Sequence, residues 1–308
     1  MNFKLKKVWI KNEKNELIDE LQVRLFSDLH LEYDYSFKIP NIQKNQIIIL
    51  AGDIHNNGRS KSLNEKLTAF FHDILSQGAI ILFVAGNHDY WGTHIEKYNS
   101  LINQFERENE NFYFLNDSSV FINDIEFLGG TLWTNFNKKD TRTYLEVQGH
   151  KDYGRTANTS NDYHKIKEKY EKDGRTIYTK LTSKTTYLRH IKTVKYLTER
   201  AGEHHTQFVV THHAPSEIFV DKERWNKHKK NGYDYNINKY SYYSELEYLA
   251  EQFNYWASGH THKYVNEYYK NTLFLSIPRG YIDKKNEKNS EVVNKFNPNL
   301  IIKIKVKK

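Results

Sequence analysis

The chain has 308 residues, a formal net charge of +8 at pH 7 and no cysteine. This length suits one large α/β domain or two small ones, and a core of this size needs no disulfide or structural metal to be stable. The missing cysteines exclude disulfide frameworks, thiolate metal sites, iron–sulfur clusters and cysteine nucleophiles. No apolar run approaches the length of a membrane span, about 20 residues, and the N-terminal residues lack the apolar segment of a signal peptide. We therefore expect a cytoplasmic protein without a membrane partner or an obligatory protein partner.

The positive charge favours an anionic partner. A nucleic acid would fit this charge, but no basic stripe or nucleic-acid-binding motif accompanies it. An AT-rich genome, which enriches Lys, Asn, Ile and Tyr, explains the same composition. The charge is compatible with an anionic phosphate substrate in either case.

Five short apolar runs each end in polar residues that are able to bind metals. Such runs, bounded by Gly and polar turns, are typical of buried strands, here at residues 21–26, 47–50, 80–84, 208–210 and 255–257. One-sided apolar spacing predicts helices over 62–75 and 187–197, and Ser244 is a suitable N-cap for a helix through Gln252. Strands that alternate with helices predict an α/β fold, which gathers its ligands at the carboxyl ends of the strands.

Further strands are expected over 121–128, 272–277 and 300–306, the last alternating Ile and Val with Lys as a half-exposed edge strand would. Residues 134–202 are highly charged, rich in Tyr and interrupted by Gly149, Gly154 and Gly174. A segment of this length between core strands often has its own helices and forms a lid or a substrate wall. We therefore predict a single domain over residues 1–308, with an inserted helical lid over about 134–202 that selects the substrate.

Seven metal donors follow the predicted strands. Asp28 and His30 are two positions apart, so an extended backbone would project both from one side, and His260 and His262 repeat this arrangement. The remaining donors come from three other strand ends, which gives the set Asp28, His30, Asp53, Asn87, His212, His260 and His262. One metal rarely takes seven such ligands, but two metals that share a bridging carboxylate would use them fully. Mixed histidine and carboxylate ligation suits Mn, Fe, Zn, Co or Ni better than Ca or Mg, and we expect Mn or an Fe/Zn type.

Two metals at roughly 3.5–4 Å suit in-line displacement at phosphorus by a bridging hydroxide. His88 directly follows Asn87, so a ligand and a second imidazole would share one loop. We expect His88 to give a proton or hydrogen bond to the leaving oxygen, and Asp89 to orient the His88 ring.

The ordered set Asp28-x-His30, Gly52-Asp53, Gly86-Asn87-His88-Asp89, His212 and Gly259-His260-x-His262 resembles the calcineurin-like metallophosphoesterase superfamily. The resemblance spans residues 28–262 and implies a four-layer α/β/β/α sandwich of two mixed sheets flanked by helices. It also implies that one metal takes Asp28, His30, Asp53 and His262, and that the other takes Asp53, Asn87, His212 and His260. His212 matches the family's ligand by its distance from Pro215, although Ala214 loosens the match and keeps His213 as an alternative.

A narrower resemblance links residues 27–32, 130–134, 161–163 and 278–281 to a bacterial and phage subgroup of generic phosphoesterases. Most members of that subgroup have no assigned substrate. An arginine at this edge is able to clamp a phosphate, and aromatic or polar neighbours are able to line a pocket. The candidate substrate contacts are His213, Arg279, Tyr281, Trp133, Asp162 and Tyr163.

The sequence therefore predicts a dinuclear metal-dependent phosphoesterase, with phosphodiesters favoured over phosphomonoesters. The substrate is a phosphate ester, with nucleotides and nucleic acids among the candidates. A nuclease acting on DNA or RNA is the alternative that the charge motivates. A non-catalytic metal-binding scaffold is a second alternative, but such proteins usually have ligands replaced, whereas here every expected position is filled.

Overall fold

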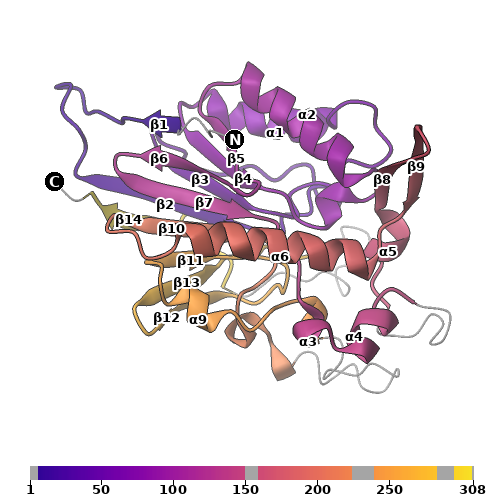
Figure 1. The fold of residues 1–308 in the computed structure, drawn as a ribbon. Helices are drawn as coiled ribbons and strands as arrows, with labels where there is room; N and C mark the ends of the chain where they lie inside the picture. The colour runs from indigo at the N-terminus through magenta and orange to yellow at the C-terminus, as the bar shows by residue number, and fades with distance from the viewer. Residues whose placement is uncertain (1–5, 150–158, 224–238, 283–294, 307–308) are drawn as a thin grey trace.

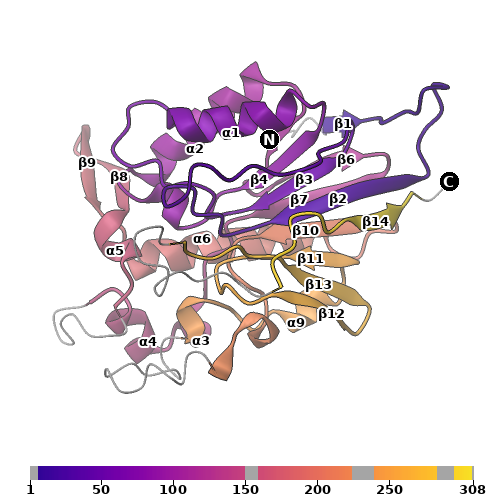
Figure 2. The ribbon, with the colours of Figure 1, turned by 180° about the vertical axis from the view of Figure 1, so that it is seen from behind.

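The computed structural model describes residues 6–149, 159–223, 239–282 and 295–306. Two sheets pack face to face, with helices on both outer surfaces (Figures 1 and 2). The first sheet has five strands in the order β14 (Ile302–Lys305), β2 (Glu20–Phe26), β3 (Ile47–Ala51), β4 (Ile80–Val84) and β5 (Phe112–Phe114). Strands β2 to β5 are parallel, and β14 is an antiparallel edge strand.

The second sheet has seven strands and is mixed in direction. Their order is β1 (Lys6–Val8), β6 (Ser118–Ile122), β7 (Ile125–Gly130), β10 (Gln207–Thr211), β11 (Tyr255–Ala257), β13 (Thr272–Ser276) and β12 (Val265–Tyr269). At its centre β7, β10, β11 and β13 are parallel. Parallel strands end together at one edge, so residues that follow them meet there.

Helices cover the outer face of each sheet. The first sheet is covered by α1 (Glu65–Leu75) and α2 (Ile95–Glu108), and the second by α6 (Ser183–Arg200) and α9 (Glu247–Ala250). Short elements lie between them: η1 (His88–Tyr90), α3 (Phe136–Lys139), α4 (Thr141–Glu146), α5 (Asp162–Lys165), η2 (Glu217–Phe219) and η4 (Lys239–Ser241). None of the helices in the described ranges is long and apolar enough to span a membrane.

Strand β3 shows why the core strands do not alternate apolar with polar residues. Ile48 and Leu50 pack against the cluster that includes α1 and α2, whereas Ile47 and Ile49 pack between the two sheets. A strand that is covered on both faces is apolar throughout, as expected for parallel strands in α/β proteins. The predicted four-layer α/β/β/α sandwich is confirmed.

The predicted strands at 21–26, 47–50, 80–84, 208–210, 255–257 and 272–277 are confirmed, as is the edge strand near the C-terminus. A single strand over 121–128 is wrong, because the chain turns back there and forms the hairpin β6–β7. The turn residues Asn123 and Asp124 have φ values of 45° and 62°. Asn and Asp tolerate this left-handed conformation, which a two-residue hairpin turn requires.

The helices over 62–75 and 187–197 are confirmed as α1 and α6. The helix expected from Ser244 to Gln252 is shorter, because α9 covers only Glu247–Ala250 and has no side-chain N-cap. Ser244 is not that cap; its hydroxyl accepts a hydrogen bond from the backbone N–H of Asn135 at 3.0 Å. Ser244 thus bonds to a residue that is distant in sequence and does not cap a helix.

Residues 134–202 form more than helices. Besides α3, α4, α5 and α6, the segment contains a hairpin of β8 (Lys167–Lys172) and β9 (Arg175–Lys180) that projects from the body near α5 (Figure 1). The C-terminal half of α6 belongs to the core, since Leu197 packs on the second sheet. Gly154 lies outside the described residues. The role of this segment as a lid stays a prediction.

Candidate metal centre

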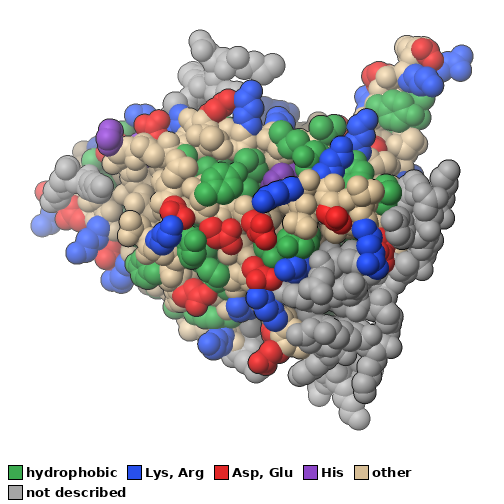
Figure 3. Space-filling model, turned by 60° about the horizontal axis from the view of Figure 1, so that its bottom comes forward, with side chains coloured by type: hydrophobic (Ala, Val, Ile, Leu, Met, Phe, Trp, Pro, Cys, Tyr) green, Lys and Arg blue, Asp and Glu red, His purple; other side chains and the backbone are tan. Residues whose placement is uncertain are grey.

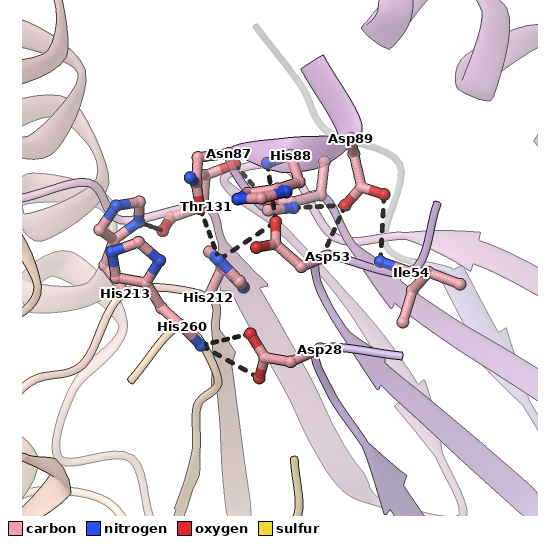
Figure 4. Close-up of polar contacts among 12 residues, drawn as sticks. Asp28, Asp53, Ile54, Asn87, His88, Asp89, Thr131, His212, His213 and His260 are labelled. Carbon is pink, nitrogen blue, oxygen red and sulfur yellow. Dashed lines mark hydrogen bonds and ion pairs between the residues drawn. The ribbon is translucent and has the colours of Figure 1, made fainter. Parts of the chain in front are cut away.

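The predicted donors follow strands β2, β3, β4, β10 and β11 and lie together at the carboxyl edge of both sheets. Figure 4 shows five of them: Asp28, Asp53, Asn87, His212 and His260. Backbone hydrogen bonds hold the strand ends to one another. The N–H of Asp28 donates to the carbonyl of Gly52 at 3.0 Å, and the N–H of Gly259 donates to the carbonyl of His212 at 3.0 Å. The sequence motifs therefore form one site because the strands that carry them end at one place.

The backbone of this site is strained. Five of the predicted ligands have positive φ values: Asp28 at 51°, His30 at 44°, Asp53 at 54°, His260 at 69° and His262 at 54°. Asp28 and His30 do not lie on extended backbone, because the chain leaves the strand geometry after Phe26. Non-glycine residues in this region cost of order 1–3 kcal/mol each, and such strain concentrates at functional sites.

The first group of donors consists of Asp28, His30 and His262, whose ligand atoms all lie within 4.8 Å of one another. The Nε2 atoms of His30 and His262 are 3.2 Å apart, and His262 Nε2 is 3.3 Å from Asp28 Oδ1. Two buried imidazole nitrogens and a carboxylate oxygen that converge in this way match the donor types that bind Mn, Fe or Zn.

The second group consists of Asp53, His212 and His260, again within 4.8 Å. His212 Nε2 lies 2.9 Å from Asn87 Oδ1 and 3.3 Å from Asp53 Oδ1, while His212 Nδ1 contacts the carbonyl of Ala51 at 2.9 Å (Figure 4). A proton on Nδ1 would be held by that carbonyl, which leaves the Nε2 lone pair for a metal.

Asp53 lies between the two groups. A carboxylate oxygen of Asp53 lies within 4.8 Å of ring nitrogens of His30 and His88. Asp53 also lies within 4.8 Å of ring nitrogens of His212 and His260. Asp53 thus belongs to two of the groups of candidate metal ligands.

The charges of the site are tightly coupled. Burial alone would lower the pKa of His212, but the carboxylates of Asp53 and Asp28 raise it to about 9. Burial alone would raise the pKa of Asp53, but the neighbouring imidazoles hold it well below its usual range. Buried carboxylates that stay ionised among imidazoles provide the negative charge that a divalent cation would neutralise.

His213 lies behind the two groups. Its Nδ1 is 3.2 Å from the carbonyl of Thr131, and its ring packs 5.1 Å from that of Trp133 and 4.2 Å from that of His260. Burial lowers the pKa of His213 to about 3, so the ring stays neutral. This geometry supports His212 over His213 as a ligand.

His88 lies beside both donor groups. Its backbone N–H donates to Asp53 Oδ1 at 2.8 Å, its Nε2 is 3.2 Å from the Tyr281 hydroxyl, and its ring stacks on that of Trp91 with centroids 3.5 Å apart. The Tyr281 ring also stacks on His30 at 4.2 Å, so Tyr281 is part of the site.

Asp89 does not orient the His88 ring, contrary to expectation. Its carboxylate is fully buried and accepts hydrogen bonds from four backbone N–H groups at 2.7–3.2 Å, those of Asp53, Ile54, His55 and Gly86 (Figure 4). Asp89 therefore fixes the two loops that follow β3 and β4.

Glu32, rather than Asp89, is the carboxylate beside the His88 ring. Its Oε1 lies 3.4 Å from His30 Nδ1 and 3.9 Å from His88 Nδ1. Burial alone would raise the pKa of Glu32, but the neighbouring imidazoles of His30 and His88 lower it to about 2. Sequence reasoning assigned no role to Glu32; its position two residues after His30 was the available signal.

Asp162 lies behind Asn87. Its Oδ1 accepts hydrogen bonds from Asn87 Nδ2 at 2.9 Å and from Trp91 Nε1 at 2.7 Å, and its Oδ2 accepts one from the Ser160 hydroxyl at 2.9 Å. Both oxygens of the Asp162 carboxylate therefore accept hydrogen bonds from protein groups. The short helix α5 in the 134–202 segment thus contacts a predicted ligand directly.

The side chains of the other candidate contacts pack against or bond to other protein groups. Arg279 forms a buried ion pair with Asp34, Nη2 to Oδ2 2.6 Å, and packs over the ring of Phe37. The Tyr163 hydroxyl bonds to that of Thr186 at 3.2 Å within the core of the first sheet. Trp133 is buried beside His213.

Gly86 and Gly259 lie where loops of the site approach each other too closely for a side chain. A Cβ atom on Gly86 would overlap Asp53 Oδ1 and the ring of His212, and one on Gly259 would come within 2.8 Å of Asp28 Oδ2. Even alanine at these positions would displace a predicted ligand.

A four-layer α/β sandwich with buried His and Asp clusters at its strand ends defines a metal-dependent hydrolase. The chain belongs to the calcineurin-like phosphoesterase family, whose model matches residues 21–264. It therefore hydrolyses phosphate esters and binds divalent metal.

Two comparisons extend over most of the chain. An uncharacterized protein of Acanthamoeba polyphaga mimivirus is 27% identical over 286 residues, which cover 87% of this chain and 94% of the viral protein. The crystal structure of phosphopantetheinyl hydrolase from Mycobacterium tuberculosis superposes with a TM-score of 0.58 over 85% of this chain and 90% of that one. At 13% identity, this similarity shows the fold alone.

Proposed function

We propose that this protein hydrolyses phosphodiesters at a centre of two divalent metal ions of the Mn or Fe/Zn type. The position of Asp53 between two groups of donors is the observation that carries the proposal. Asp28, His30, Asp53 and His262 would hold one ion, and Asp53, Asn87, His212 and His260 the other. When bound, two such ions acidify water and neutralise charge on the phosphoryl oxygens.

His88 assists the departing alcohol in this proposal. Its Nε2 atom, 3.2 Å from the Tyr281 hydroxyl, is the group that gives a hydrogen bond or proton to the leaving oxygen. Glu32 lies on the Nδ1 side of the ring, with its Oε1 3.9 Å from that nitrogen, and contributes negative charge there. Stacking on Trp91 restricts the ring further.

Phosphodiesters are favoured because a diester has a second ester group that stays on phosphorus and needs a binding surface. Lys165 lies against Trp91 beside His88, with its ammonium 3.6 Å from the indole ring. This arrangement places an exposed cation next to His88, at the surface where the second ester group would lie.

The experiment is metal analysis by mass spectrometry together with Mn-stimulated hydrolysis of bis-p-nitrophenyl phosphate and of p-nitrophenyl phosphate. We expect two equivalents of metal and faster hydrolysis of the diester in the wild type, with both metal and activity lost in Asp53→Ala. Asp124→Asn is the matched control, because Asp124 lies in the β6–β7 turn at positive φ, which Asn tolerates.

Two results would count against the proposal. Wild-type protein that holds metal but hydrolyses neither ester would favour the scaffold alternative, as would full biological activity after His88→Ala. Faster hydrolysis of the monoester would contradict the preference for diesters alone.

A further inference from the structure

The hairpin β8–β9 projects from the body of the protein beside α5 (Figure 1), and Lys and Arg side chains lie both at its tip and near its base (Figure 3). Residues 165–180 contain six cationic and three anionic side chains. Strands this short and this polar bury little apolar surface, so their own packing does not explain the projection.

Cations face cations across this hairpin. Lys167 is paired with Lys180 at the base, and Lys172 with Arg175 at the tip. All four are exposed, and none forms an ion pair with any residue that the structure describes. Like charges directly opposite each other destabilise a strand pair. The two pairs lie on opposite faces of the hairpin, and an anionic ligand beside either pair would replace its repulsion with attraction.

Aromatic side chains lie among these cations. Residues paired across the strands share a face, so Tyr178, opposite Lys169, lies on the face that also carries Lys167 and Lys180. The Tyr178 side chain is 54% exposed, and Tyr170 on the other face is 44% exposed. Exposed aromatic rings between cations are the combination on which single-stranded nucleic acids stack their bases while the phosphates are neutralised.

The base of the hairpin is joined to the metal centre. The N–H of Gly92 donates to the carbonyl of Lys165 at 2.9 Å, and the N–H of Lys167 donates to the carbonyl of Thr93 at 2.9 Å. Trp91 lies between the ring of His88 and the ammonium of Lys165, at 3.5 Å and 3.6 Å from the indole respectively. Lys165 therefore places a cation between the Trp91 ring beside His88 and the first residue of the hairpin, Lys167.

We propose that the β8–β9 hairpin and Lys165 bind a single strand of nucleic acid and deliver one of its phosphodiesters to the metal centre. This inference rests on the proposed function, because the substrate is a phosphodiester. In the reaction, water forms a new P–O bond, one P–O ester bond breaks, and the departing oxygen takes a proton. One end of the cut strand is then a phosphomonoester and the other a hydroxyl.

Binding is tested apart from cleavage by fluorescence anisotropy, with a labelled single-stranded oligonucleotide, the full chain and excess EDTA. The test variant is Lys167→Ser with Lys180→Ser. The matched control is Lys14→Ser with Lys44→Ser, which removes the same charge from exposed lysines that precede β2 and β3, at the opposite ends of these strands from the metal centre.

We expect the test variant to bind about tenfold more weakly and to lower the slope of log K against log salt by about 1.4, or about 0.7 for each lysine. The control should match the wild type. Thermal unfolding should show no loss of stability in the test variant, because a repulsive pair has been removed. Hydrolysis of bis-p-nitrophenyl phosphate should be unchanged.

Equal oligonucleotide binding by the test variant and the wild type would overturn the inference, and so would equally hairpin-dependent binding to vesicles of anionic lipid. A different result is expected if the hairpin binds nucleic acid but the protein does not hydrolyse phosphodiesters. In that case the hairpin would still bind the oligonucleotide in EDTA, while metal-loaded protein would cleave neither the oligonucleotide nor the aryl diester.

Discussion

Asp162 Oδ1 accepts a hydrogen bond from Asn87 Nδ2 at 2.9 Å, and this contact turns the amide oxygen of Asn87 toward His212 Nε2. An asparagine amide binds a metal only through its oxygen. The carboxylate of α5 therefore decides which end of the amide faces the centre, across 75 positions of sequence.

Asp162→Asn should weaken metal binding at the site of Asn87. An amide in place of the carboxylate no longer fixes the orientation of the Asn87 amide, and loss of such a partner costs about 10–100-fold in metal affinity or activity. Metal titration followed by calorimetry, together with kcat for the aryl diester, checks this. Asp124→Asn is again the control. Unchanged affinity in Asp162→Asn would mean that Asn87 is oriented without it.

Glu32→Gln should lower both metal affinity and kcat. The carboxylate lies 3.4 Å from His30 Nδ1 and 3.9 Å from His88 Nδ1, so Gln would remove the negative charge beside both rings. We expect a loss of about 10–100-fold in activity, with KM for the aryl diester changed much less. A change confined to KM would instead assign Glu32 to substrate binding. Glu168→Gln on the exposed hairpin is the matched control.

His212→Gln should remove one equivalent of metal, whereas His213→Gln should retain both. Only His212 has its Nε2 directed at Asp53 and Asn87; the ring of His213 lies between Trp133 and His260. Metal content by mass spectrometry separates the two variants. Loss of metal in His213→Gln but not in His212→Gln would reverse the assignment.

Glu126→Gln should destabilise the fold at neutral pH by about 2 kcal/mol, the size of a buried hydrogen bond to a charged group. The buried Glu126 carboxylate accepts hydrogen bonds from Arg200 at 2.6 Å and from Gln207 at 2.8 Å. Burial alone would raise the pKa of Glu126, but hydrogen bonds, the first of them from His205, lower it overall. Its stabilisation is therefore complete above the unfolded pKa of about 4.3 and is lost as the pH falls through the lower folded pKa.

Urea unfolding in EDTA, at pH 7 and at steps below pH 4.5, tests this pH dependence. The difference in unfolding free energy between the wild type and Glu126→Gln should shrink as the pH falls. A constant difference at every pH would contradict the prediction. Glu13→Gln, at an exposed position, should match the wild type throughout.

Much of the fold was predictable from the local sequence, and so was the proximity of the candidate donors. Apolar runs such as 47–50 indicate strands that are covered on both faces, and the polar residues that follow them must lie at the carboxyl edge of a parallel sheet. The order of Asp28, Asp53, Asn87, His212 and His260 then predicts one site. These features depend only on neighbours in sequence and on the geometry of parallel strands.

Only the tertiary structure decided which groups support those donors. Glu32 rather than Asp89 faces His88, Asp162 serves Asn87, and Arg279 is held by Asp34. Each contact joins residues from different loops, and a carboxylate carries no local sign of the partner that it will meet. The like-charge pairs of β8–β9 also needed the strand register, because a shift of one residue would place different side chains opposite each other. The sequence by itself determined most of the core strands and suggested the donors, whereas long-range packing decided the β6–β7 hairpin and the partners of the candidate donors.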